Sequence, residues 1–202
     1  LASLGFTEVA VLASPKIVLI VTGDELQSPG KSLGYGQVYE SNSQLLQSAL
    51  TWLRFSQVKI VYAKDDLLAL TSVLTDALNA ADLVLLTGGV SVGDYDFVPK
   101  AAADAGVKTV FHKIKQKPGK PFYFGRHNLT LVFALPGNPA AVMSCFYEYV
   151  VQAISSFTQK EYFKKMAFPL ADDFNKKAGL TYFLKGKMGE NNVKVLDNQE
   201  SY

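Results

Sequence analysis

Glycine, serine and aspartate crowd into one short segment of this 202-residue chain, residues 87–96 (TGGVSVGDYD), directly after the apolar run LVLL. Glycine allows positive φ and close approach of the backbone, so amide N–H groups can point at an anion. Aspartate supplies the hard oxygen ligands that Mg²⁺ prefers, usually one or two carboxylates beside phosphate oxygens. A plain turn needs only one or two such residues. The segment therefore favours a phosphate or metal site over a simple turn.

Two other apolar runs end in loops of similar character. KIVLIV leads into TGDEL, which carries Asp24 and Glu25 as further oxygen ligands, and LTLVFA leads into LPGNP. In LPGNP, Gly137 precedes Asn138, which is a good N-cap, and Pro139 suits the first position of a helix. A glycine before a helix start is a natural seat for phosphate.

These loops should lie together, because ligands of parallel α/β sheets bind beyond the carboxyl ends of the strands. A fourth segment, KPGKP (residues 117–121), adds two lysines that suit an oxyanion. Taken separately, TGDEL is typical of an acidic turn and LPGNP of a helix start. Together, the four segments predict one site for a phosphorylated or nucleotide-bearing ligand.

The elements that would position this site alternate between short β-branched runs and amphipathic runs. Strands are expected at 16–21, 57–63, 81–86, 107–112 and 129–135. Helices are expected at 41–55, with Asn42 or Ser43 as N-cap; at 65–81, with Asp65 or Asp66 at its start; and at 96–106 and 138–157. This alternation predicts a doubly wound, mostly parallel α/β sheet.

The texture of the sequence divides the chain into three parts. Residues 1–12 read as the end of a preceding domain or a linker, and residues 13–157 as the α/β domain. Residues 158–202 have short alternating apolar residues and glycine turns, which predict an incomplete small β domain. Because the chain begins at Leu1 without methionine, we expect it to be a fragment of a longer protein.

Composition argues against some classes of partner. The net charge of +2 gives no global field for nucleic acid, and no apolar run approaches the roughly 18 residues of a membrane span. The single cysteine, Cys145, cannot form an intrachain disulfide and is expected in the core, which fits a reducing compartment such as the cytoplasm. Basic residues gather in one segment with few acids and predict a local basic patch: Lys108, Lys113, Lys115, Lys117, Lys120 and Arg126.

The segments TGDEL, YESNS, TGGVSVGDYDF, KPGKPFYFG and LPGNP, in this order and spacing, resemble the molybdopterin molybdenumtransferase family, which includes the E domain of gephyrin. The resemblance covers residues 1–157, and the remainder is similar to the start of the family's C-terminal β domain. Adenylyltransferase and CinA-like relatives share the fold and parts of two motifs, but neither combines GVSVGDYD, KPGKP and LPGNP.

The resemblance implies that molybdate is inserted into adenylylated molybdopterin while a divalent metal, Mg²⁺ or another, supports hydrolysis and release of AMP. It also implies a homodimer of the full-length protein. The positions it associates with catalysis are Asp24, Glu25, Asp96, Lys117 and Lys120. Those it associates with the metal are Asp94 and Asp96. Those it associates with the substrate are Thr87, Gly88, Gly89, Ser91, Gly93, Pro136, Gly137 and Asn138.

Two departures from the family pattern concern oxyanion binding. Ala141 stands where the family usually has serine, and Lys185 where it commonly has arginine. Alanine offers no hydrogen bond, and lysine cannot make the bidentate grip of arginine. Two alternatives therefore stand beside the enzyme: a scaffold or binding homologue without turnover, and a molybdopterin adenylyltransferase.

Overall fold

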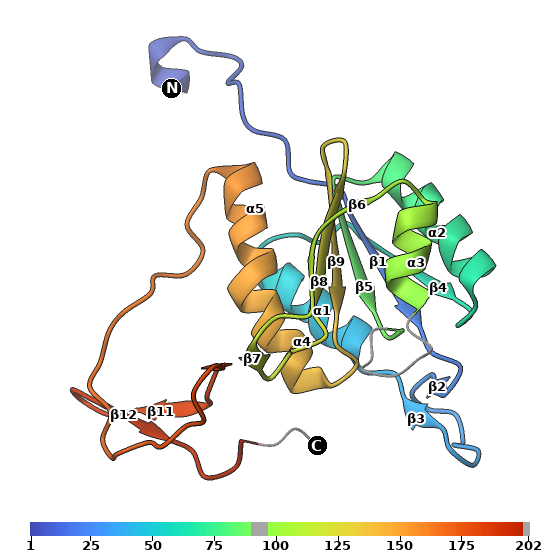
Figure 1. The fold of residues 1–202 in the computed structure, drawn as a ribbon. Helices are drawn as coiled ribbons and strands as arrows, with labels where there is room; N and C mark the ends of the chain where they lie inside the picture. Colours follow the sequence, from blue (N-terminus) through green and yellow to red (C-terminus); the bar gives the residue numbers. More distant parts are fainter. Residues whose placement is uncertain (90–96, 200–202) are drawn as a thin grey trace.

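The computed structural model describes residues 1–89 and 97–199, and a six-stranded sheet forms its centre (Figure 1). The strand order is β4-β1-β5-β9-β8-β6. The bounds of these strands are β1 Ile17–Thr22, β4 Val58–Ala63, β5 Leu83–Thr87, β6 Lys108–His112, β8 Tyr123–His127 and β9 Thr130–Leu135. The four strands β4, β1, β5 and β9 are parallel neighbours, which confirms the predicted mostly parallel sheet.

Strand β8 was not expected from the sequence. It pairs antiparallel with both β9 and β6, so it runs against the other five strands of the sheet. Its sequence YFGRH contains a glycine followed by Arg126 and His127, and its first three residues overlap the segment KPGKPFYFG. A tight connection through Asn128, with φ of 52°, joins it to β9.

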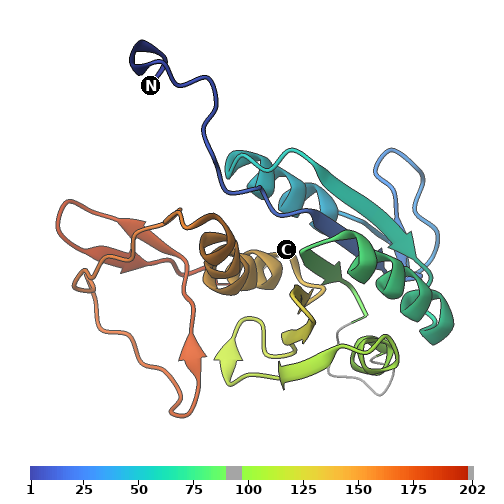
Figure 2. The same cartoon turned by 90° about the horizontal axis from the view of Figure 1, so that it is seen from above.

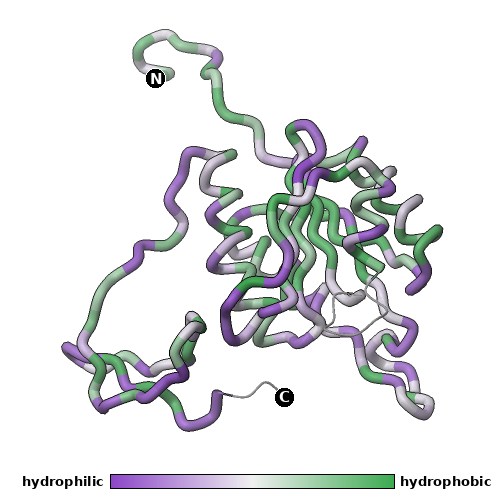
Figure 3. Tube along the Cα trace, in the orientation of Figure 1, coloured by the Kyte–Doolittle hydropathy of each residue, from purple (hydrophilic) through white to green (hydrophobic). Residues whose placement is uncertain are grey.

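Helices cover both faces of the sheet, as the doubly wound prediction requires. One face packs α1 (Asn42–Trp52), α4 (Pro139–Cys145) and α5 (Val151–Thr158) against the odd-numbered side chains of β1. The other face packs α2 (Leu67–Ala80) and α3 (Phe97–Asp104) against the even-numbered ones. All six residues of β1 are buried, and the strands form the apolar centre in Figure 3.

The predicted long helix at 138–157 contains a π-helical turn, Phe146–Val150, between α4 and α5. Asn138 is the N-cap of α4, accepting a hydrogen bond from the Ala141 N–H at 3.1 Å, and Pro139 begins the helix, both as expected. Helix α2 begins after Asp66, which settles the choice between the two aspartates. The predicted N-cap of α1, Asn42 or Ser43, is wrong, because Ser41 occupies the N-cap position and its side chain makes no capping hydrogen bond.

The two ends of the chain extend away from the sheet (Figures 1 and 2). Residues 1–13 are exposed and contain one 3₁₀ turn, Ala2–Leu4. After α5 the chain forms short strands in small pairings rather than one compact sheet. These strands are β10 Thr181–Tyr182, β11 Gly186–Met188 and β12 Val193–Val195. Within residues 1–89 and 97–199, no helix is long and apolar enough to cross a membrane.

Candidate functional site

The carboxyl ends of β1, β5 and β9 lie side by side at one edge of the sheet, because the three strands are parallel neighbours. The structure thus brings Asp24, Glu25, Thr87, Gly88 and Gly89 to the same edge as the LPGNP loop. That loop carries Pro136, Gly137 and Asn138. Ser91, Gly93, Asp94 and Asp96 lie outside the described residues, so the structure says nothing about their predicted roles.

Asn42 links two of these loops through one side chain. Its Nδ2 donates to Thr87 Oγ1 at 2.9 Å, at the end of β5, and to the carbonyl oxygen of Gly137 at 2.8 Å, after β9. Asn42 stands at the start of α1, where the buried Glu40 carboxylate accepts hydrogen bonds from the backbone N–H and the hydroxyl of Ser43. The YESNS segment therefore fixes the relative positions of two site loops.

The β1 and β5 loops approach each other at Gly88. Its φ is 85°, and a Cβ built there would lie 1.7 Å from the carbonyl oxygen of Thr22. No side chain fits at such a distance from backbone. Packing between the two strand ends therefore requires glycine at this position. From the sequence alone, the glycine was expected only to let the backbone approach a ligand.

Carboxylates gather at the β1 and β4 end of this edge. The Asp65 N–H donates to Asp24 Oδ1 at 3.4 Å, and the Thr22 hydroxyl lies 3.5 Å from Asp65 Oδ1. Burial raises the pKa of the Asp65 carboxyl, and the nearby charges of Asp24 and Glu25 raise it further. These acids repel one another, so a cation placed among them would be favoured electrostatically.

The mutual repulsion gives a testable result for Asp65→Asn, which should stabilise the metal-free fold near pH 7. A carboxyl with a raised folded-state pKa binds more protons when folded, so its ionisation destabilises the fold as pH rises through that pKa. The gain in Tm should therefore shrink as pH falls toward the unfolded aspartate pKa of about 3.9. Thermal unfolding measured across pH in the presence of a chelator gives the answer.

The neighbouring aspartate provides a matched control. Asp66 caps α2 by accepting the Ala69 N–H at 2.9 Å, so Asp66→Ala should lose about 1 kcal/mol of stability. A lower Tm for Asp65→Asn at neutral pH would contradict the repulsion described above.

The KPGKP segment lies between β6 and β8, at the same edge because β6 ends there. Lys117 and Lys120 are both exposed, whereas Gln116 is only 4% exposed. The Lys117–Pro118 peptide is cis, and the Ile114 N–H donates to the Lys120 carbonyl at 2.9 Å. Two exposed ammonium groups on a hydrogen-bonded loop can bind a tetrahedral oxyanion.

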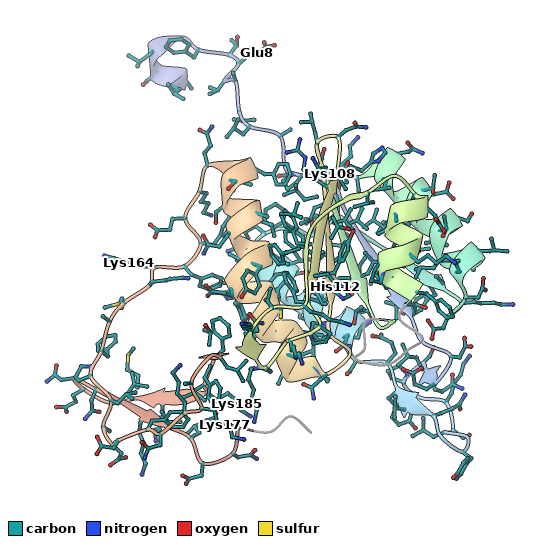
Figure 4. All side chains as sticks on the ribbon, viewed as in Figure 1. Glu8, Lys108, His112, Lys164, Lys177 and Lys185 are labelled. Carbon is teal, nitrogen blue, oxygen red and sulfur yellow. The ribbon has the colours of Figure 1, made fainter. Side chains whose placement is uncertain are left out.

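The predicted basic patch divides in the structure. Lys108 lies opposite Arg126 in the antiparallel register of β6 and β8, at the start of β6. The KPGKP loop follows the other end of that strand. Five residues of extended chain span about 17 Å, so Lys108 and the KPGKP lysines cannot bind the same small oxyanion. Figure 4 shows Lys108 and His112 at different heights along the sheet. Burial, assisted by the charge of Lys113, lowers the pKa of His112, which adds no positive charge near pH 7.

The two departures from the family pattern differ in position. Ala141 is 4% exposed, so a hydroxyl at this position would be buried at the first turn of α4. Lys185 is exposed on the C-terminal segment (Figure 4). Its backbone N–H donates to Gln199 Oε1 at 2.8 Å.

A cleft among the described residues lies beside the predicted site. It has a volume of about 330 Å³ and lies beside β1 and β2 (Leu26–Gln27), the latter paired with β3 (Val38–Tyr39). Its lining includes Asp24, Glu40 and Lys64. Larger clefts of about 760 and 400 Å³ lie beside α5 and at the opposite edge of the sheet, and neither contains a residue that the sequence singled out for chemistry.

Sequence reasoning missed two contributors. Asp65 was considered only as a helix start, although it lies two residues after the end of β4 and the same strand-end rule would have located it. Asn42 was considered only as an N-cap, and no local pattern reveals that its amide joins two loops 45 and 95 residues further along the chain.

Comparison with known proteins agrees with this geometry. Residues 18–156 match the family described as a probable molybdopterin binding domain. A molybdopterin molybdenumtransferase of Synechocystis sp. is 32% identical over 190 residues, which cover 93% of this chain and 46% of that protein. One from Haemophilus influenzae is 36% identical over 165 residues, which cover 82% and 41%. This chain thus spans about half the length of the curated relatives it matches.

Solved structures lead to the same family. A molybdopterin biosynthesis MoeA protein from Pyrococcus horikosii superimposes with a TM-score of 0.71 at 26% identity, covering 91% of this chain and 45% of that one. A CinA protein from Thermoplasma acidophilum, 18% identical with a TM-score of 0.55 over 69% of this chain, shares the fold alone. The family match across the whole sheet, together with the loops gathered at its edge, shows that this chain belongs to the molybdopterin-binding domain family.

Proposed function

We propose that the protein carrying this chain is a molybdopterin molybdenumtransferase that acts in molybdenum cofactor biosynthesis. It would insert molybdate into adenylylated molybdopterin while the phosphoanhydride is hydrolysed and AMP leaves. The observation that carries the proposal is the division of charge along one sheet edge. Acids lie at the β1 and β4 end and lysines on the loop before β8. Gly88, Gly89 and the LPGNP loop, at the ends of β5 and β9, lie between them.

The spacing suits a long substrate. Strands β1 and β8 are three positions apart in the sheet, which corresponds to about 14 Å at the usual strand spacing. An adenylylated pterin has its phosphoanhydride and its dithiolene at different points along its length, so one ligand can meet both charged groups. The backbone N–H groups of Gly88 and Gly89 would face the phosphates in the middle of the edge.

The donor set at the acidic end fits Mg²⁺ when substrate phosphates complete the coordination. In the described part of the chain, no three carboxylate, histidine or cysteine side chains are close enough to hold a metal by themselves. Mg²⁺ commonly uses only one or two carboxylates plus phosphate oxygens. We assign this role to Asp24 and Asp65, with Glu25 nearby, and by resemblance to Asp94 and Asp96. The ion would neutralise charge on the phosphoanhydride as it breaks.

The protein's own groups would do the rest. Lys117 and Lys120 would hold molybdate by charge-assisted hydrogen bonds, and Asn42 would keep the Thr87 and Gly137 loops in register under the substrate. Hydrolysis then consumes one water and releases AMP. The proposal includes a homodimer, as the family resemblance implies. It also includes a cytoplasmic location, because a chain with a single cysteine suits a reducing compartment.

The proposed function is tested with full-length protein, adenylylated molybdopterin and Mg²⁺, with and without molybdate. AMP release that depends on molybdate supports the enzyme. Binding of the adenylylated ligand without AMP release would favour the scaffold alternative. That alternative is motivated by Ala141 and Lys185, which stand where the family usually has serine and arginine. Consumption of ATP with unmodified molybdopterin would favour the adenylyltransferase.

A further inference from the structure

A buried glutamine holds the lysine loop from inside. Gln116, at the start of β7 (Gln116–Lys117), directs its Nε2 to the carbonyl oxygens of Pro118 at 3.0 Å and Gly119 at 3.4 Å. The same nitrogen lies 3.4 Å from Cys145 Sγ. One amide therefore contacts two successive carbonyl groups of the loop that separates the two lysines.

The other end of this amide is held by the π-helical turn. The Tyr149 hydroxyl donates to Gln116 Oε1, and the Tyr149 ring stacks on Phe122 with centroids 4.7 Å apart. Tyr149 belongs to the segment Phe146–Val150, where the helix widens by one residue. Single π turns inserted in α-helices frequently occur at functional sites. Here the turn places the tyrosine hydroxyl on the only side-chain acceptor that Gln116 has.

The loop is tightly packed around the Gln116 side chain. At Gly119, where φ is 95°, an added Cβ would lie 2.5 Å from Cys145 Sγ and 2.6 Å from Gln116 Nε2. On its outer side the loop pairs with the C-terminal segment, since β7 is parallel to β10 and the Phe183 N–H donates to the Lys117 carbonyl at 2.9 Å (Figure 2). The two lysine side chains remain exposed while their backbone is held on both sides.

We propose that Gln116 and Tyr149 are positioning residues that set the lysine loop for oxyanion binding, with Tyr149 acting through Gln116. The inference rests on the proposed function, in which Lys117 and Lys120 bind molybdate. Neither Gln116 nor Tyr149 needs to touch the substrate. Without the Gln116 amide, both ammonium groups remain on the loop but occupy a wider range of positions. Anion binding should therefore weaken more than the chemical step slows.

The kinetic test compares Gln116→Met, which keeps the volume and removes the hydrogen bonds, with Tyr149→Phe, which removes only the hydroxyl. We expect the molybdate KM of full-length protein to rise about tenfold for the first and about threefold for the second, with kcat within about twofold of wild type. The double variant should match Gln116→Met alone, because Tyr149 acts through Gln116.

The matched control is Tyr147→Phe, two residues earlier on the same turn, where the side chain is 44% exposed; its KM should equal that of wild type. An unchanged KM in both test variants, or fully additive effects in the double variant, would overturn the proposal.

Hydrogen exchange separates this inference from the proposed function. The amides of Ile114 and Phe122 donate to the Lys120 and Gly119 carbonyls, so they report the loop directly. Both should exchange faster in Tyr149→Phe and Gln116→Met than in wild type, with exchange in the central strands unchanged. If the wild type releases no AMP, the proposed function fails, and exchange alone then decides the positioning role: unchanged exchange overturns it and faster exchange at these two amides supports it.

Discussion

Replacing Gly88 with alanine should destabilise the fold by more than about 3 kcal/mol, the largest effect expected of any single substitution at the site. The methyl group would meet the Thr22 carbonyl oxygen at 1.7 Å, and this oxygen belongs to the backbone at the end of β1, a buried strand beside β5. Relief requires the β5 loop to move away from β1. The left-handed φ of 85° adds its own cost for a residue with a Cβ. Denaturant unfolding of wild type and variant measures the difference.

Two other glycines make this prediction specific. Gly36 also has a left-handed φ, 77°, but nothing lies within 4 Å of its added Cβ, so Gly36→Ala should show the backbone cost alone, about 1 kcal/mol. Gly137 lies in a site loop with open space and no positive φ, and Gly137→Ala should change stability by less than about 0.5 kcal/mol. Equal losses at Gly88 and Gly36 would contradict the close packing of the two strand ends.

Lys120→Ala should reduce molybdate-dependent AMP release by at least about 100-fold, the loss typical of removing one donor that meets charge in a reacting complex. The side chain is exposed, and the loop is held by backbone and Gln116 contacts that the substitution leaves intact. Stability should therefore stay within about 0.5 kcal/mol of wild type. Steady-state AMP release and thermal unfolding, measured on the same preparation, separate lost binding from lost folding.

Lys108→Ala is the control for charge. It removes a lysine from the same basic segment, but at the opposite end of β6 from the KPGKP loop. A comparable loss of activity in Lys108→Ala would mean that the net charge of the segment matters rather than the position of Lys120.

The buried strands and the starts of α2 and α4 could be predicted from the sequence because their signals are local. KIVLIV is apolar throughout and becomes β1, and Asn138 followed by Pro139 caps α4 as expected. Strand β8 escaped prediction because Gly125 and polar residues interrupt it, and its stability comes from pairing with β9 and β6. The π turn has no sequence signature in CFYEYVV, and its contact between Tyr149 and Gln116 joins residues 33 positions apart.

The candidate site divides in the same way. Parallel strands place the three loops at one edge of the sheet, so Asp24, Gly88 and Gly137 could be grouped from the sequence alone. The contribution of Asn42 depends on contacts between distant segments. The division of the basic residues depends on strand direction, which places Lys108 away from Lys120. The predicted domain limits at 12 and 157, and the metal role of Asp94 and Asp96, stay predictions.

The central claim is tested most directly by AMP release from adenylylated molybdopterin, followed with full-length protein in Mg²⁺ as molybdate is titrated from zero. The account predicts little AMP without molybdate, a saturable rise with molybdate, and loss of that rise in Lys120→Ala although the variant remains folded. AMP release at the same rate with and without molybdate, or a wild-type protein that binds the ligand and never releases AMP, would contradict it.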